Sequence, residues 1–107
     1  MVERNLRIEM LKQFLADDPG DDFSEYALAL EFEKSGLRNE AITHFENILK
    51  RNPFYLPVYY QAGRMHEAEK NFNAATALYE KGMEIALQQG NTKTLNELRT
   101  ALDMMDE

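Results

Sequence analysis

Cysteine is absent from this chain of 107 residues. Disulfide bonds and metal sites built from thiolates are therefore excluded, and such a chain suits a reducing compartment. We accordingly predict a cytoplasmic location. No apolar run approaches the about 20 residues that a membrane-spanning helix needs, and the segment Met1–Asn5 lacks the apolar stretch of a secretory signal. We therefore expect neither a membrane partner nor a signal peptide.

Basic residues are also few. The 12 Lys and Arg residues are outnumbered by 19 Asp and Glu residues, which gives a net charge of −7. This balance would repel a polyanion such as DNA or RNA, and no basic stripe along the chain offsets it. We therefore expect no nucleic-acid partner.

Val and Ile, which favour strands, are scarce, and no segment alternates apolar with polar residues. Both observations favour an all-α fold. Breaks that contain Pro, Gly or capping residues divide the chain into six segments of helical length. We predict side-chain caps at Asp22, Asn39, Asn73 and Thr94 for four of the helices. Pro57 is expected in the first turn of the fourth helix, where its missing N–H costs nothing.

One spacing of 34 residues recurs along the chain. It separates the large apolar residues Leu11, Phe45 and Tyr79, and it also separates the pairs Ala41 and Ala75, Asn39 and Asn73, and Pro19 and Pro53. A period in this range indicates stacked helical units, none of which buries its own apolar face alone. Because a glycine inside a helix costs about 0.5–1 kcal/mol relative to alanine, Gly63 and Gly82 predict crowded contacts between helices.

These positions resemble the pattern of the tetratricopeptide repeat (TPR) family, which has an aromatic residue, Leu-Gly, Tyr, Ala, an aromatic residue and Pro in that order. The matching residues are Leu28-Ala29, Phe32, Ala41, Phe45 and Pro53 in one unit and Tyr59, Ala62-Gly63, His66, Ala75 and Tyr79 in the next. Two positions depart from the pattern: Glu25 replaces the first aromatic residue of one unit, and Leu87 replaces the Pro of the other.

The resemblance implies an all-α, right-handed α-α superhelix (a TPR solenoid) of about six helices, forming a single TPR domain over residues 1–107. Its expected parts are a half-repeat helix at 3–19, repeat 1 at 22–55, repeat 2 at 56–89 and a capping helix at 92–106. The last helix is out of register with the repeats. Arg99 there takes the place of Gly63 and would block another close helix pair, as a terminal cap requires.

Residues with catalytic potential are sparse. His44 and His66 are the only side chains that ordinarily titrate near neutral pH, and neither has a nucleophile at a recognisable spacing. His66 stands at a packed position, and His44 is expected on the outer side of its helix, so structural roles are favoured for both. The acidic loop around Asp17–Asp22 lacks the ligand order of a calcium loop. We therefore predict a protein that is not an enzyme, with no catalytic residue, no metal and no cofactor.

The surface with functional promise is the concave face formed by the first helix of each repeat, which in TPR proteins commonly binds extended peptides or partner helices. The residues predicted to form this face are Phe23, Tyr26, Leu30 and Glu33 from repeat 1 and Tyr60, Arg64 and Glu67 from repeat 2, with Asn96 and Asp103 as an extension. Exposed aromatic residues beside an Arg are typical of interaction hot spots. The predicted function is therefore non-catalytic binding of a short peptide or partner helix.

An alternative stays open, in which the chain is a self-associating structural unit. In this hypothesis Phe23, Tyr26 and Tyr60 are buried in a homodimer interface. The partner is then a second copy of the chain and not a different protein or peptide.

Overall fold

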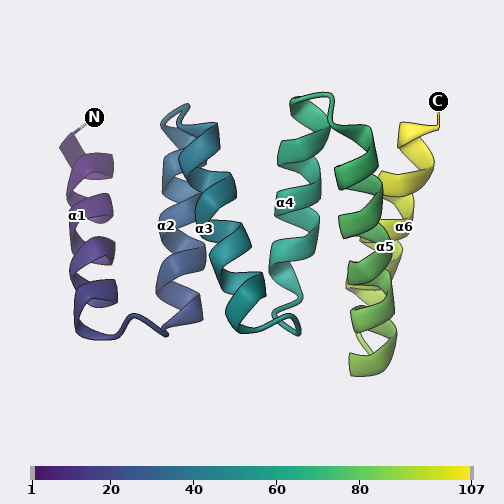
Figure 1. The fold of residues 1–107 in the computed structure, drawn as a ribbon, viewed down its shortest axis with the longest axis horizontal. Coiled ribbons are helices and arrows are strands. Elements are labelled where there is room, and N and C mark those ends of the chain that lie inside the picture. The colour runs from purple at the N-terminus through teal and green to yellow at the C-terminus, as the bar shows by residue number, and fades with distance from the viewer. Residues whose placement is uncertain (1, 107) are drawn as a thin grey trace. The chain divides into compact units, whose positions relative to one another are not determined.

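A computed structural model of the chain describes residues 2–106, apart from the side chains of Val2 and Arg4. These residues form six helices and no strand, which confirms the predicted all-α class (Figure 1). The helices are α1 (Val2–Asp17), α2 (Asp22–Lys34), α3 (Arg38–Arg51), α4 (Pro57–Ala68), α5 (Phe72–Gln89) and α6 (Thr92–Met105). Within this part of the chain, no helix combines the length and apolar character needed to cross a bilayer. The two end residues of the predicted 1–107 domain lie outside the described residues.

The chain divides between Tyr55 and Leu56 into two compact units. This division falls at the border predicted between repeat 1 and repeat 2. In the N-terminal unit, α2 packs against both α1 and α3. In the C-terminal unit, α5 packs against both α4 and α6. Each unit therefore has a central helix that is covered by a neighbour on two sides.

Residues that stand 34 positions apart in the sequence make equivalent packing contacts in the two repeats. Phe45 and Tyr79, which stand 34 residues apart, are both fully buried. The Phe45 ring lies 5.9 Å from the ring of Tyr26, and the Tyr79 ring lies 6.4 Å from the ring of Tyr60. Each central contact thus joins one large buried ring to a tyrosine on the first helix of the same repeat. Leu11, one period earlier, is half-buried in α1.

Both helical glycines lie in crowded contacts, as predicted. A methyl group on Gly63 would overlap the ring of Tyr79. On Gly82 it would lie 2.7 Å from Cβ of Tyr59 and 2.9 Å from Cδ1 of Leu98. Gly82 therefore lets both α4 and α6 approach α5 closely.

The predicted cap of α2 is wrong by one residue. The capping residue is Asp21, whose Oδ1 accepts a hydrogen bond of 3.3 Å from the backbone N–H of Ser24. Asp22 already lies inside the helix and binds Arg51 instead. For α6, the cap is Asn91 and not Thr94, because Asn91 Oδ1 accepts from the backbone N–H of Thr94 at 3.0 Å.

The predicted caps of α3 and α5 are also wrong. Leu37 and Asn71 precede these helices without a side-chain cap, and Asn39 and Asn73 lie within the first turn. The backbone turns so tightly here that the next helix starts at once: Leu37 N–H donates to the Phe32 carbonyl and Asn71 N–H donates to the His66 carbonyl, both at 2.8 Å. Pro57 does stand in the first turn of α4, as predicted.

Candidate functional site

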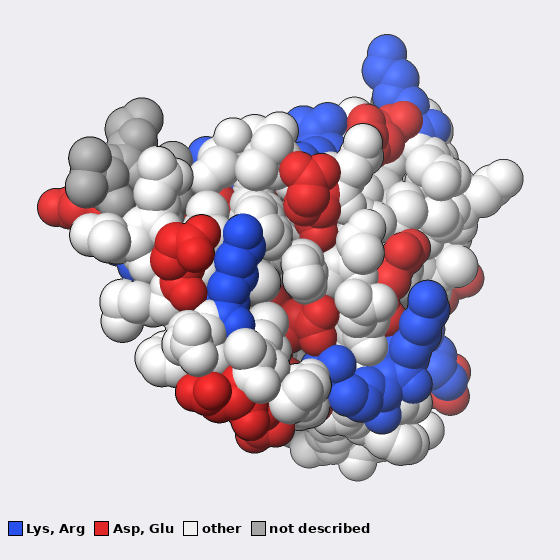
Figure 2. Space-filling view, turned by 60° about the vertical axis from the view of Figure 1, so that its left-hand side comes forward, with Lys and Arg blue, Asp and Glu red and all other residues white. Residues whose placement is uncertain are grey.

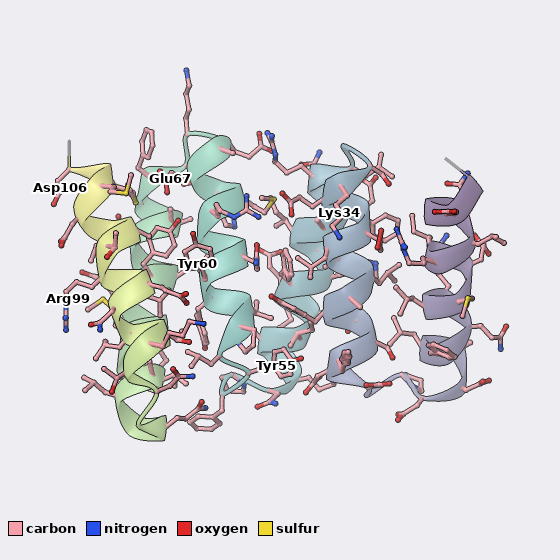
Figure 3. The ribbon with its side chains drawn as sticks, turned by 180° about the vertical axis from the view of Figure 1, so that it is seen from behind. Lys34, Tyr55, Tyr60, Glu67, Arg99 and Asp106 are labelled. Carbon is pink, nitrogen blue, oxygen red and sulfur yellow. The ribbon has the colours of Figure 1, made fainter. Side chains whose placement is uncertain are left out.

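A groove lies between α4 and α6 of the C-terminal unit. It has a volume of about 440 Å³, and its lining residues are Tyr60, Lys93, Asn96, Glu97, Thr100, Ala101 and Met104. The crowded contact of Leu98 with Gly82 holds α6 against α5, which brings the polar side of α6 next to α4. Tyr60 is half-buried, because its ring packs on Tyr79. Figure 3 shows Tyr60 and Glu67 on α4, Arg99 on α6 and Asp106 directly after the end of α6.

Of the predicted concave-face residues in this unit, the structure brings Tyr60 together with Asn96. Arg64 and Glu67 do not line the groove. Arg64 Nη2 donates a hydrogen bond of 2.7 Å to Oε1 of Gln61, one turn earlier on α4. Glu67 Oε1 accepts a hydrogen bond of 2.9 Å from the hydroxyl of Tyr79. Glu67 therefore helps to fix the buried ring on which Tyr60 rests.

The hydroxyl of Tyr79 is held in its neutral form. Burial raises the pKa of Tyr79 above its ordinary value, and the hydrogen bond to Glu67 raises this pKa further. A phenolate at this point would have lost its hydration and would face the Glu67 carboxylate. The hydrogen bond therefore positions the ring, and the Tyr79 hydroxyl stays protonated at neutral pH.

The predicted concave-face residues of the N-terminal unit differ in exposure. Phe23 is 63% exposed, whereas Leu30 and Glu33 are half-buried. Tyr26 is half-buried between two rings, with its centroid 5.9 Å from that of Phe45 and 5.8 Å from that of Tyr55. Phe23 is thus the most available apolar side chain of this predicted face, and Tyr26 belongs partly to the core.

A buried polar cluster around Glu25 was not predicted. Glu25 is only 5% exposed, and its carboxylate is bound from α3 by three side chains. Its Oε1 lies 2.9 Å from Arg51 Nη2, its Oε2 lies 2.8 Å from His44 Nδ1, and Asn47 Nδ2 donates to Oε2 at 3.4 Å. Arg51 also binds Asp22 at 2.6 Å. The departure of Glu25 from the repeat pattern was the available signal in the sequence.

His44 therefore lies toward α2. The prediction that it lies on the outer side of its helix is wrong. Its ring stacks on Phe32, with centroids 5.4 Å apart and planes 18° from parallel. The carboxylate of Glu25 accounts for this placement, because a buried carboxylate needs polar partners. A cavity of about 500 Å³ adjoins the cluster, and it is lined by Leu15, Pro19, Glu25, Asn47, Lys50 and Arg51. We interpret the cluster as a structural clamp between α2 and α3.

On the molecular face seen in Figure 2, Asp and Glu side chains are spread among uncharged ones, with Lys and Arg between them. This distribution agrees with a chain in which both signs are present and acidic residues are in excess.

The helical-hairpin packing and the repeated ring contacts define a helical-repeat protein. Residues 56–89 match the family model described as tetratricopeptide repeat. The crystal structure of a tetratricopeptide repeat domain protein from Salinibacter ruber is 32% identical in sequence and superimposes with a TM-score of 0.77, covering 80% of this chain and 96% of that one. The chain belongs to the tetratricopeptide repeat family, and its fold is the all-α solenoid type of that family.

Two further structures share the fold. BPP2914 from Bordetella parapertussis is 19% identical, with a TM-score of 0.80 over 92% of this chain and 86% of that one. MamA is 20% identical, with a TM-score of 0.79 over 82% of this chain and 52% of that one. No match was found among curated proteins. TPR domains generally serve as protein-interaction modules, and this coarse function applies to the chain. Proteins of the family are typically non-catalytic.

Proposed function

We propose that this protein binds a short peptide or a partner helix in the groove between α4 and α6. The single observation that carries the proposal is the groove of about 440 Å³ that Tyr60 shares with α6. It combines an aromatic ring and the exposed Met104 with the amide of Asn96. An apolar anchor beside a few polar groups is the usual composition of a recognition site.

Each side chain has a defined role in this proposal. The ring of Tyr60, held from behind by Tyr79, offers a rigid apolar surface at low entropic cost. Asn96 Oδ1 already accepts a hydrogen bond of 3.2 Å from Arg99 Nη1, and its Nδ2 would donate to a peptide carbonyl. Lys93 and Glu97 stand one turn apart at the groove and would select the charge of flanking residues. Arg64 and Glu67 remain predicted members of the same face.

The concave-face residues of the N-terminal unit belong to the proposal as a second contact region. Phe23 supports it, because a large ring with that exposure gains most from being covered. Tyr26, Leu30 and Glu33 are half-buried and would add contact area without large rearrangement. The same exposure of Phe23 favours the alternative, in which Phe23, Tyr26 and Tyr60 are covered by a second copy of the chain.

The proposal is tested by selecting peptides from a display library on the immobilised full-length chain. Binding of the enriched peptide is then measured by titration calorimetry for the wild type, Tyr60→Ala and Asn96→Ala. We expect each substitution to weaken binding at least tenfold. Leu87→Ala, which shortens an exposed side chain of α5 outside the groove, is the matched control and should leave binding unchanged.

Equal binding by Tyr60→Ala and the wild type would contradict the proposal that the groove between α4 and α6 binds the peptide. Loss of binding together with loss of helical circular dichroism would show unfolding, so helicity is recorded for every variant. A cytoplasmic location and the absence of catalysis also remain proposals. Fractionation of the native cells checks the location.

A further inference from the structure

Helix α1 carries apolar residues on two sides. On one side, Ile8 is buried and Leu11 and Leu15 are half-buried. On the other side, Leu6, Met10 and Phe14 are 58%, 56% and 48% exposed. Their spacing of four residues places them in one stripe along the helix. This set, which we call the α1 stripe, is unusual, because a surface helix of a soluble protein normally has a single apolar side.

In repeats 1 and 2, the second helix is α3 and α5, respectively. Each has the side that corresponds to the α1 stripe, and the repeat shows what covers that side. Phe14 stands at the same place in the repeat as Ile48 of α3 and Gly82 of α5. Ile48 is fully buried, and Gly82 lies under Tyr59 of α4. Within residues 2–106, no helix precedes α1 in the manner that α2 precedes α3 and α4 precedes α5. The α1 stripe is therefore the side on which the first helix of a repeat packs.

The groove beside the stripe has the matching shape. It has a volume of about 270 Å³ and lies between α1 and α2, lined by Arg7, Met10, Leu11, Phe14, Ala27 and Glu31. Helix α6 follows α4 with a step of 36 residues, as Arg99 follows Gly63. With this step, Ala27 and Glu31 of α2 correspond to Glu97 and Ala101 of α6, which line the groove with Tyr60 of α4. A helix that packed on α1 as α4 packs on α5 would thus also cover the edge of α2.

Helix α6 of a second copy does not suit this groove. In α6, Leu98 is fully buried against Gly82 of α5, and the exposed Met104 lines the groove with α4. Arg99 is exposed (Figure 3). Arg99 stands where Gly63 allows close packing in α4. On α1 the corresponding close-packing position is occupied by Arg7, which binds Glu31 at 3.0 Å. A head-to-tail contact would bring two arginines together where the repeat uses small residues.

Helix α1 of a second copy does suit it. It offers a stripe of its own, and two helices related by a two-fold axis perpendicular to them run antiparallel, as the helices of each hairpin do in Figure 1. The charges also favour this element. The segment 2–17 holds three acidic and three basic residues, so it is neutral in a chain of net charge −7, and its charged residues are Glu3, Arg4, Arg7, Glu9, Lys12 and Asp17. The net charge of the chain therefore causes little repulsion between two copies of α1.

We propose that two copies of this chain associate through α1 around a two-fold axis near Met10, so that the α1 stripe of each copy covers that of the other. This contact uses the N-terminal unit alone and is separate from the α4/α6 groove. One helix face per copy is smaller than the about 20–30 residues a side of a standard interface. The association is accordingly weak, with a dissociation constant in the micromolar to millimolar range.

Sedimentation equilibrium of the full chain at micromolar to millimolar concentration tests the proposal. The wild type should form dimers at the upper end of this range. Met10→Glu should raise the dissociation constant at least tenfold while helicity is retained, because Met10 is exposed in the single copy. Leu87→Glu makes the same change of charge at an exposed apolar residue of α5 and should dimerise as the wild type does.

A cross-linking measurement tests the two-fold geometry. Because the chain has no cysteine, Met10→Cys introduces a single thiol that would meet its own copy across the axis. Mild oxidation at millimolar concentration should give a disulfide dimer much faster for Met10→Cys than for Leu87→Cys. A monomeric wild type at every concentration would overturn the proposal. So would a dimer that survives Met10→Glu, or equal cross-linking of the two cysteine variants; a dimer lost with Tyr60→Ala but not Met10→Glu would indicate the concave-face alternative.

Discussion

Gly63 of α4 lies directly against the ring of Tyr79 of α5, so closely that a methyl group on Gly63 would overlap the ring. The ring has little freedom to move away. Its hydroxyl donates to Glu67 at 2.9 Å, and Tyr60 packs on it with ring centroids 6.4 Å apart. The close approach of the two helices in repeat 2 therefore depends on the absence of a side chain at Gly63.

The extra methyl group of Gly63→Ala should cost about 1–3 kcal/mol through overpacking of the core, so we expect the variant to unfold more easily. This loss outweighs the about 0.5–1 kcal/mol that alanine gains over glycine inside a helix. Urea denaturation followed by circular dichroism measures the difference. Gly20→Ala is the control, because the nearest atom to its new methyl group would be Asp18 Oδ1 at 3.8 Å. An unchanged or increased stability of Gly63→Ala would contradict the crowding.

The two repeats solve one packing position in different ways. Repeat 2 places the ring of Tyr59 on Gly82. Repeat 1 has Glu25 and the fully buried Ile48 at the two equivalent positions, 34 residues earlier. We expect Glu25→Tyr to overpack against Ile48, and Ile48→Gly to lose several kcal/mol through the cavity it leaves. The double variant should be more stable than the sum of the two losses predicts, by about 1 kcal/mol or more.

A double-mutant cycle by urea denaturation measures this coupling. The loss of the contacts of Glu25 with His44 and Arg51 occurs both with and without the substitution of Ile48, and it therefore cancels in the cycle. If the two losses simply add, a smaller residue at position 48 does not compensate for a larger residue at position 25.

The cap of α2 gives a prediction that distinguishes the cap seen in the structure from a cap predicted from the sequence alone. Asp21→Ala should lower the urea midpoint, whereas Asn73→Ala, at a predicted but uncapped position, should leave it nearly unchanged. The hydrogen bond from the Ser24 side chain lowers the pKa of Asp21 below its ordinary 3.8. Because a lowered pKa favours the ionised form in the fold, this contribution is present above about pH 4 and is lost as the pH falls through the lowered pKa. The Asp21→Ala loss should therefore shrink in acid, and an equal loss by Asn73→Ala would contradict the assignment.

The raised pKa of Tyr79 predicts how the stability of the fold changes in alkaline solution. Since burial and Glu67 raise its pKa in the fold, the unfolded chain loses this proton first as the pH rises. The contribution is complete below the unfolded value near pH 10 and declines above it, by at most about 1.4 kcal/mol per pH unit. Tyr79→Phe should cost about 1 kcal/mol at neutral pH through the lost hydrogen bond. Its stability should fall less steeply between about pH 10 and 12 than that of the wild type, which urea denaturation at each pH measures.

An equally steep alkaline decline in Tyr79→Phe would contradict this account. The stability of Tyr79→Phe should still fall somewhat as the pH rises, because burial also raises the pKa values of Tyr55 and Tyr59.

The sequence predicted the elements that a period encodes. Breaks at Pro, Gly and capping residues predicted the six helices, and the 34-residue spacing predicted the equivalent places of Phe45 and Tyr79. The cost of a glycine inside a helix predicted the crowding at Gly63 and Gly82. The starts of α2, α3, α5 and α6 were predicted less well, because a residue type that favours a cap does not fix the residue at which the helix begins. That residue depends on how tightly the preceding turn ends, as at Leu37 and Asn71.

Contacts between unlike side chains could not be read from the period. Glu25 was visible as a departure, yet its partners His44, Asn47 and Arg51 are identified only once α2 and α3 are packed together. The candidate site is similar in this respect. Tyr60 was predicted from its place on the first helix, but its union with Asn96 and Met104 depends on how α6 packs on α5.

Backbone NMR of the full chain, titrated with the peptide selected on it, tests the central claim that the α4/α6 groove receives a partner segment. The account predicts amide shift changes concentrated at Tyr60, Asn96, Thr100 and their neighbours, and their loss in Tyr60→Ala. Saturable binding whose shift changes leave α4 and α6 unaffected would contradict it.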